Sequence, residues 1–186
     1  MSPDERGRLN LGDYLGGPTR PVDTDTVLRW AIQFCFGMQH AIAHGVRVHR
    51  DIKPQNVLIT PEGILRITDF GLAAVAEEFP ETSQGGEAAE DLDGFSFTLL
   101  RTMGQKTVAG TIGYIAPEVF RGEGATVKSD IYSFGCVLWQ MVTGNSRPPF
   151  HTPYSGDLAR HAETIYRLQK RVDVPHIASL TLPLYL

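Results

Sequence analysis

The sequence predicts a mainly helical α+β fold that contains one small β-hairpin, and three patterns carry this prediction. Apolar residues recur at steps of three and four between Val27 and Ile42, which is typical of one face of an α-helix. Two short strand-like runs within residues 57–67 flank a Pro-Glu-Gly turn, which indicates a hairpin. After Ser129 a helical stretch is apolar on nearly all sides, so we expect a buried central helix there.

The N-terminal segment, residues 1–22, is polar and rich in glycine and proline. Its short apolar patch from Leu9 to Leu15 predicts one short helix. The long helix that follows is expected to be capped by residues 23–25 and to end at Gly45. The two strands of the hairpin are expected over residues 57–59 and 64–67.

The second half of the chain contains the central helix, which we expect to open at Ser129-Asp130 and to end at Gly144. A loop rich in proline and glycine is expected over 145–158, followed by a polar amphipathic helix over 159–172 and an apolar tail. Residues 77–97 are acidic and glycine-rich, and they carry too little apolar surface to offset the cost of ordering. They are therefore expected to form a mobile loop.

The composition excludes several classes of protein. The chain has 186 residues, enough for one domain with a core, and a net charge of -4, so it shows no basic footprint for nucleic acid or anionic lipid. It has no apolar run of transmembrane length and no apolar signal-peptide region near Met1. We therefore expect a cytoplasmic location, with no nucleic-acid or membrane partner.

The two cysteines, Cys35 and Cys136, lie far apart in apolar helical stretches. Neither has a second cysteine or a histidine at the spacing of a metal site. We expect two small buried thiols in a reducing compartment rather than a disulfide or zinc ligands.

The chemistry-bearing residues gather in the segment His49-Arg50-Asp51-Ile52-Lys53-Pro54-Gln55-Asn56. Downstream come Asp69-Phe70-Gly71, then Ala116-Pro117-Glu118, and then Asp130 at the start of the central helix. In this order and spacing the motifs resemble those of the eukaryotic-type protein kinase family. Lys53 and the stretch Gly110–Tyr114 resemble its serine/threonine branch. The resemblance runs from about Leu9 to about residue 150.

The resemblance implies a phosphate transfer from ATP to a Ser or Thr hydroxyl of a protein, with ATP and Mg²⁺ as cofactors. Asp51 would accept or orient the proton of the substrate hydroxyl, and Lys53 would lie beside the γ-phosphate. Asn56 and Asp69 would hold Mg²⁺ through oxygen ligands. Leu58 would form the floor of the adenine pocket, although it fits equally well as a core residue.

Four further residues are given structural roles by the resemblance. His49 is expected to pack near Phe70 and to bond the backbone, although a free general base is the alternative for it. Gly71 would let the backbone turn after the metal ligand. Asp130 would brace the backbone of the catalytic loop, and its position in a first helical turn also suits the helix dipole.

An activation segment is implied over residues 69–118. Arg50 would capture a phosphate in this segment through charge-assisted hydrogen bonds, and Thr107 is the first candidate for phosphorylation. Thr111 is expected to contact Asp51 and to help bind substrate. The acidic stretch 77–97 resembles an insertion in this segment, although most charge runs of this kind are merely solvated loops.

Two expected parts of a kinase are absent from the sequence. It contains no G-x-G-x-x-G loop and no strand lysine ahead of the catalytic loop. We therefore expect only the C-terminal lobe, divided into residues 1–22, a catalytic lobe over 23–158 and a truncated helix and tail over 159–186. The N-lobe and the last helices would be missing, which deprives Glu118 of its arginine partner and leaves one apolar face of the central helix uncovered.

Two hypotheses of different class remain at this point. The first is a serine/threonine kinase whose N-lobe comes from a longer or neighbouring chain. The second is a non-catalytic lobe that binds a partner, or the product of a decaying gene.

Overall fold

The computed structural model describes residues 9–17, 20–70, 109–154 and 156–171. Its elements follow in the order β1 Leu9–Asn10, α1 Leu11–Leu15, α2 Thr24–Ala43, a 3₁₀ turn η1 Pro54–Asn56, β2 Val57–Ile59, β3 Leu65–Ile67, α5 Ala109–Ile112, α6 Pro117–Phe120, α7 Val127–Thr143 and α8 Leu158–Lys170. The mainly helical prediction is confirmed. Gly71, Thr107, the stretch 77–97 and the apolar tail lie outside the described residues.

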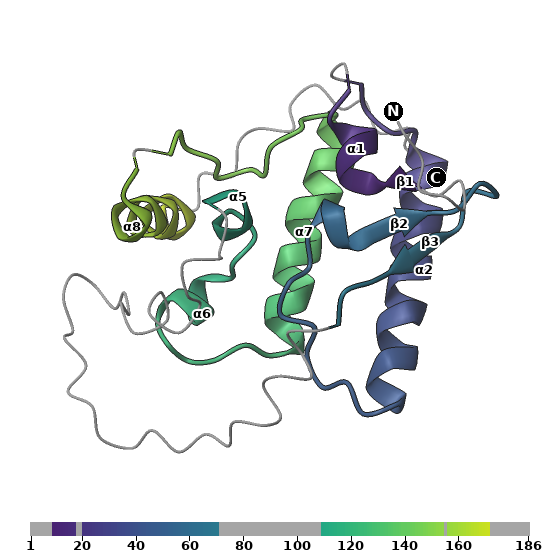
Figure 1. Ribbon diagram of the computed structural model, residues 1–186, viewed down its shortest axis with the longest axis horizontal. Coiled ribbons are helices and arrows are strands. Elements are labelled where there is room, and N and C mark those ends of the chain that lie inside the picture. Colours follow the sequence, from purple (N-terminus) through teal and green to yellow (C-terminus); the bar gives the residue numbers. More distant parts are fainter. Residues whose placement is uncertain (1–8, 18–19, 71–108, 155, 172–186) are drawn as a thin grey trace, which may run out of the picture.

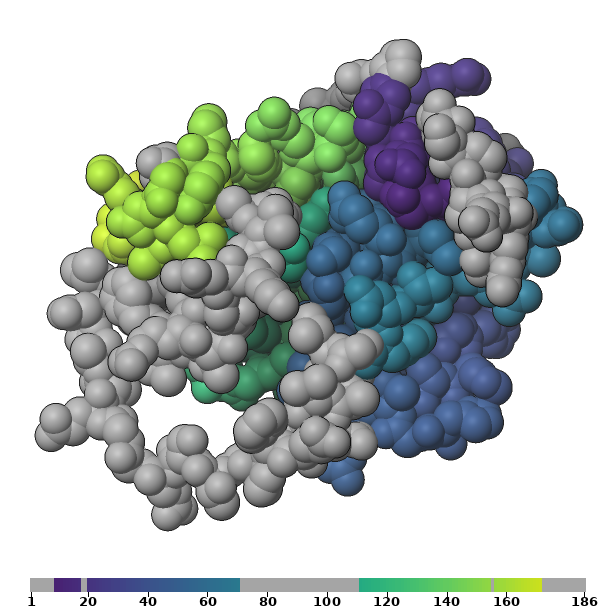
Figure 2. Space-filling model, viewed as in Figure 1, coloured from purple at the N-terminus to yellow at the C-terminus, as the bar shows by residue number. Residues whose placement is uncertain are grey.

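The two long helices, α2 and α7, form the centre of the molecule, with the small sheet beside α2 and with α5, α6 and α8 on the other side of α7 (Figure 1). The rings of Phe34 on α2 and Phe134 on α7 stack with their centroids 3.7 Å apart. In the space-filling view, α8 and the N-terminal elements lie at opposite ends of the molecule (Figure 2). Among the described helices, none has both the length and the apolar character needed to cross a membrane.

The sheet has three antiparallel strands in the order β1-β2-β3. The predicted hairpin is present as β2 and β3, with Leu58 opposite Arg66. The third strand, β1, places Leu9 opposite Ile59 and was not predicted, because two residues are too few for an alternating pattern. The helical patch expected from Leu9 accordingly begins only at Leu11.

Helix α2 follows the sequence prediction closely. The carboxylate of Asp23 caps it by accepting a hydrogen bond of 2.9 Å from the backbone N–H of Thr26. The helix ends before Gly45, whose φ of 95° only glycine adopts without strain. Cys136 on α7 is buried as expected, but Cys35 is exposed because it lies on the outer face of α2.

Helix α7 begins two residues earlier than predicted. Thr126 is its N-cap and forms a capping box with Ser129, so Ser129 is the third helical residue rather than the first. The expected central helix is buried on one face only, since Ile131 on its other face is 63% exposed. The opposite face, which includes Phe134, Val137 and Met141, is buried in the main core.

A second, smaller core lies under α8. Ile112 of α5, Phe120 of α6 and three residues of α8 bury one another in it: Ala162, Ile165 and Tyr166. Helix α8 covers nearly the range that the amphipathic pattern predicted. This core fixes the segment between α5 and α6, which borders the candidate site.

Gly144 gives a prediction about stability. It ends α7 with φ of 70°, and a Cβ there would lie 2.5 Å from the carbonyl carbon of Arg20 and 2.6 Å from the nitrogen of Pro21. Both are backbone atoms, which cannot move aside cheaply because the N–H of Val22 is bonded to the carbonyl of Met141. We expect Gly144→Ala to lower the free energy of unfolding by about 2 kcal/mol or more, measured by urea denaturation.

The matched control for this prediction is Gly135→Ala in the middle of α7. An added Cβ at Gly135 meets no atom within 4 Å, so alanine should keep or raise the stability of the helix. Equal stability of the two variants would contradict the close approach at Gly144.

Candidate active site

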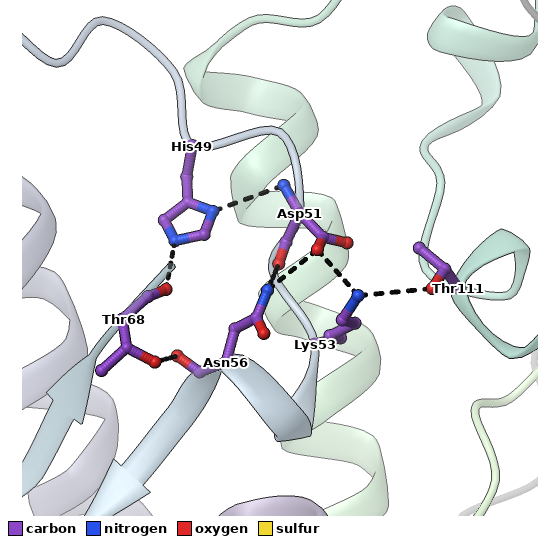
Figure 3. Close-up of polar contacts among 6 residues, drawn as sticks. All are labelled: His49, Asp51, Lys53, Asn56, Thr68 and Thr111. Atoms are coloured by element: carbon purple, nitrogen blue, oxygen red, sulfur yellow. Dashed lines mark hydrogen bonds and ion pairs between the residues drawn. The ribbon is translucent and has the colours of Figure 1, made fainter. Parts of the chain in front are cut away.

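The segment from His49 to Asn56 forms a loop between α2 and β2 that folds back on itself. The turn η1 brings Asn56 over Asp51, so that the amide Nδ2 of Asn56 donates to the backbone carbonyl of Asp51 at 2.8 Å and to its Oδ2 at 2.9 Å (Figure 3). Proline at the start of η1 favours this turn because its φ is already fixed. Asp51 is thereby held in one position relative to the start of β2.

Lys53 connects Asp51 to a distant part of the chain. Its Nζ lies 2.7 Å from Oδ2 of Asp51 and 3.4 Å from Oγ1 of Thr111 on α5 (Figure 3). Asp51 is 9% exposed, so its carboxylate is nearly out of water and depends on these partners for its charge. The ammonium of Lys53 therefore bridges the carboxylate of Asp51 and the hydroxyl of Thr111.

Asp69 follows β3 and has φ of 63°, and Arg50, just before Asp51, has φ of 70°. These are the non-glycine residues with positive φ in the part of the chain that the structure describes. Such backbone conformations persist where the surrounding contacts enforce them, as they do at functional sites. The strained positions lie immediately beside Asp51 and at the predicted metal ligand.

Thr68 places Asp69 near Asn56, and sequence reasoning missed this role. The backbone N–H and the hydroxyl of Thr68 both donate to the carbonyl of Asn56, at 2.9 Å and 3.2 Å. The residue after Thr68 must therefore lie close to Asn56. A lone threonine before Asp69 carries no signal of this kind in the sequence.

Both ring nitrogens of His49 are engaged. Nδ1 accepts from the N–H of Asp51 at 3.3 Å, and Nε2 lies 3.0 Å from the carbonyl of Thr68, which fits a neutral ring protonated at Nε2 (Figure 3). The ring centroid lies 4.6 Å from that of Phe70. This buried histidine thus ties the Asp51 loop to the end of β3.

Asp130 holds the same loop from α7. Its two carboxylate oxygens accept from the N–H of His49 at 2.7 Å and from the N–H of Arg50 at 3.0 Å. Burial raises the pKa of Asp130, while these two N–H donors oppose the rise by stabilising the carboxylate. One side chain therefore positions two consecutive backbone units just before Asp51.

Two other side chains of α7 hold the loop that follows α5. The hydroxyl of Ser133 donates to the carbonyl of Tyr114 at 2.7 Å, and the phenol of Tyr114 donates to Oε1 of Gln140 at 2.8 Å. Burial raises the pKa of Tyr114, which keeps the phenol protonated as a donor. Sequence reasoning missed Ser133 and Gln140, because they sit within an apolar helical pattern and carry no motif.

Glu118 on α6 accepts a hydrogen bond of 2.9 Å from the hydroxyl of Ser129. Ser129 also closes the capping box of α7 through the N–H of Thr126 at 3.1 Å. Ser129 therefore connects the start of α7 to the carboxylate of Glu118 on α6.

Comparison with known proteins decides the family. The protein kinase domain family matches residues 9–183. This chain belongs to the protein kinase family. Its similarity to a probable serine/threonine-protein kinase PknB of Lactococcus lactis is 32% identity over 151 residues, which cover 81% of this chain and 20% of that protein. With the serine/threonine-protein kinase mos of Xenopus laevis, the identity is 37% over 81% of this chain and 36% of that protein.

A further kinase relative is the probable PknB of Bifidobacterium longum, 37% identical over 63% of this chain and 14% of that protein. The chain thus spans between about a seventh and about a third of the length of these relatives. The kinase motifs that carry the sequence resemblance all fall inside the matched range.

Leu58 lies on the face of the small sheet that points away from the main core. Its neighbours Val57 and Ile59 are buried in that core, whereas Leu58 is only half-buried, as alternation along a strand requires. Leu58 is therefore not a plain core residue.

The remaining kinase motif residues differ in their settings. Arg50 and Asp69 are exposed, whereas His49, Asn56 and Asp130 are buried. Asn56 and Asp69 offer an amide and a carboxylate oxygen, which are ligands that Mg²⁺ prefers. The donor set near the end of β3 thus fits the metal that the kinase family uses.

Proposed function

We propose that this chain is the catalytic lobe of a serine/threonine protein kinase that transfers the γ-phosphate of ATP to a Ser or Thr hydroxyl of a protein. The observation that carries the proposal is the arrangement around Asp51. Its carboxylate is fixed by Asn56 and Lys53, and the hydroxyl of Thr111 lies on the far side of the lysine. Positioning and charge neutralisation are the main tasks of a protein in phosphate transfer.

Each residue has a distinct role in this mechanism. Asp51 orients the acceptor hydroxyl and accepts its proton, while the ammonium of Lys53 offsets the negative charge that gathers on the transferred phosphate. Asn56 and Asp69 would hold Mg²⁺, which neutralises charge on the phosphates of ATP. Thr111, through its contact with Lys53, would border the position of the acceptor.

The supporting residues keep this arrangement in place. Asp130 and His49 hold the loop, Phe70 packs on His49, and Leu58 would form the adenine floor. Glu118 anchors the end of the proposed activation segment, 69–118. Arg50 is exposed, as a phosphate-capturing arginine must be, and Thr107 and Gly71 stay predictions because they lie outside the described residues.

The boundaries 1–22, 23–158 and 159–186 and the cytoplasmic location also stay predictions. The Gly-rich loop and strand lysine that cover ATP in kinases are absent from these 186 residues. We propose that an N-lobe in a longer or neighbouring chain supplies them. The alternative is a lobe that binds a partner without catalysis.

One experiment separates these two functions. The purified chain is incubated with Mg²⁺ and ATP labelled at the γ-phosphate, with dephosphorylated casein as acceptor and with EDTA as the control. A kinase should label serine or threonine in a Mg²⁺-dependent way and should show a higher melting temperature with Mg²⁺ and ATP together. If the chain shows no labelling and no thermal shift, catalysis by this chain is rejected and the partner-binding lobe is supported.

A further inference from the structure

The loop that leads from α7 to α8 passes α5, the helix that carries Thr111 (Figure 1). An added Cβ at Gly113, two residues after Thr111, would lie 2.5 Å from Cγ of Pro148 in this loop. The loop comes so close because glycine has no side chain. It therefore borders the place where Thr111 meets Lys53, which the proposed function assigns to the acceptor hydroxyl.

Gln140 of α7 holds both sides of this contact. Its Oε1 accepts from the phenol of Tyr114 at 2.8 Å, and its Nε2 donates to the carbonyl of Asn145 at the start of the loop. We call residues 111–114 and 145–151 together the acceptor wall. One buried side chain thus connects the two parts of the acceptor wall.

The acceptor wall carries a positive charge. It contains no Asp or Glu, although the chain has 21 acidic residues and only 17 basic ones. Arg147 is exposed in it, and none of the residues that the structure describes forms an ion pair with this arginine. On the other side of Thr111, Lys53 already neutralises the carboxylate of Asp51 at 2.7 Å. An acidic side chain that approaches the wall is therefore attracted to it.

His151 orients the side chain of Arg147. A guanidinium N–H of Arg147 donates to Nε2 of His151, and the backbone N–H of Arg147 donates to Oδ1 of Asn145 at 3.0 Å. Nε2 can accept only while the ring is neutral. Burial first, and then the nearby Arg147 and His161, lower the pKa of His151, which keeps the ring neutral at pH 7. The other N–H groups of Arg147 are thereby directed and available to a carboxylate.

Arg147 lies within reach of a substrate segment that passes Thr111. The step from Thr111 to Gly113 spans at most about 7 Å, and one peptide unit of about 3.8 Å separates Pro148 from Arg147. The path along the wall is therefore on the order of 15 Å, which an extended segment covers in about five residues.

We propose that the acceptor wall selects protein substrates that carry an acidic side chain within about five residues of the Ser or Thr, and that Arg147 binds this side chain. The proposal rests on the proposed function, because it takes the hydroxyl bound near Asp51 as the acceptor. His151 is a positioning residue in it, since it acts only through Arg147.

Three peptides with one central serine test the proposal on the whole chain. They carry Glu, Gln or Lys at the third to fifth positions on both sides of the serine, and alanine and glycine elsewhere. Anisotropy of fluorescein-labelled peptides measures binding, and γ-labelled ATP with Mg²⁺ measures transfer. The Glu peptide should bind and accept phosphate at least about fivefold better than the Lys peptide, and raised salt should reduce this difference.

Arg147→Glu locates the binding site. It should reverse the order, so that the Lys peptide binds better than the Glu peptide, which an unfolded variant cannot do. The matched control is Arg29→Glu, the same change at an exposed arginine of α2, which lies across α7 from the acceptor wall (Figure 1). This control should keep the preference of the unaltered chain.

His151→Leu and His151→Gln test the positioning role. Leucine offers Arg147 no acceptor, so the ratio of Glu-peptide to Lys-peptide binding should fall by about twofold or more. The amide oxygen of glutamine can accept, so His151→Gln should restore the ratio. If His151 only stabilised the loop, His151→Leu would weaken all three peptides alike and leave the ratio unchanged.

The possible outcomes separate this proposal from the proposed function. Equal binding and equal transfer for all three peptides would overturn the proposal and leave catalysis standing. A preference for the Glu peptide that Arg147→Glu reverses, without any transfer, would support the acidic-segment site and reject catalysis by this chain. Equal losses in Arg147→Glu and Arg29→Glu would assign the preference to net charge and overturn the role of Arg147. The absence of both binding and transfer would reject both.

Discussion

Asp51→Asn is expected to lower the rate of phosphate transfer by about 10²–10⁴-fold, because asparagine cannot accept the proton of the acceptor hydroxyl. The side chains have the same shape, so the amide oxygen of asparagine can still accept from Lys53, which now lies 2.7 Å from Oδ2. The melting temperature should therefore change much less than the rate. Initial rates with labelled ATP, measured beside thermal unfolding curves, check both expectations.

Asp25→Asn is the matched control for this variant. Asp25 lies exposed in the first turn of α2, far along the chain from the Asp51 loop, and its neutralisation should leave the rate unchanged. If Asp51→Asn kept the full rate of transfer, Asp51 would have no part in the chemistry, and another residue would have to activate the hydroxyl.

Asp130→Ala is expected to have the largest effect on stability, about 4 kcal/mol of unfolding free energy. The carboxylate accepts from the N–H groups of His49 and Arg50, and its loss leaves two donors without a partner, at about 1–3 kcal/mol for each buried one. Urea denaturation, monitored by tryptophan fluorescence, measures the total change in the free energy of unfolding. Hydrogen exchange at the amides of His49 and Arg50 should accelerate more than exchange in α2, which identifies the loop as the part released.

The control for Asp130→Ala is Asp25→Ala, the same change at an exposed site. It should shift the unfolding free energy by well under 1 kcal/mol, since surface substitutions away from special features have small effects. Unchanged protection of the His49 and Arg50 amides in Asp130→Ala would show that other contacts hold the loop.

The sequence alone was sufficient for the helices with a clear period. Asp23 and the apolar positions of α2 identify that helix because capping and a 3.6-residue period are local properties. The start of α7 was placed two residues late, because Ser129 is the third residue of the helix, where it closes the capping box with Thr126, rather than the first. Strand β1 was missed because only its pairing with β2 makes its two residues a strand.

The candidate site likewise has features that the local sequence indicates and features that only long-range contacts decide. The order of its motifs in the sequence was enough to indicate the family, because the spacing from Asp51 to Asn56 depends on one local turn. The contacts that place these residues are not local: Asp130 bonds the backbone of His49 across 81 residues, and Lys53 reaches Thr111 across 58. Thr68, Ser133 and Gln140 entered the site only through such contacts.

By itself, then, the sequence indicated which residues are proposed to carry the chemistry and which long segments are helical, since both depend on residue type and short-range spacing. Only the tertiary structure decided how α7 holds the loop around Asp51 together with the loop around Tyr114, and which faces stay open. That α7 buries Phe134 but leaves Ile131 exposed depends on how the helices pack, since their contacts join residues far apart in the chain. A periodic pattern specifies an apolar face, but only packing shows whether the protein itself covers it.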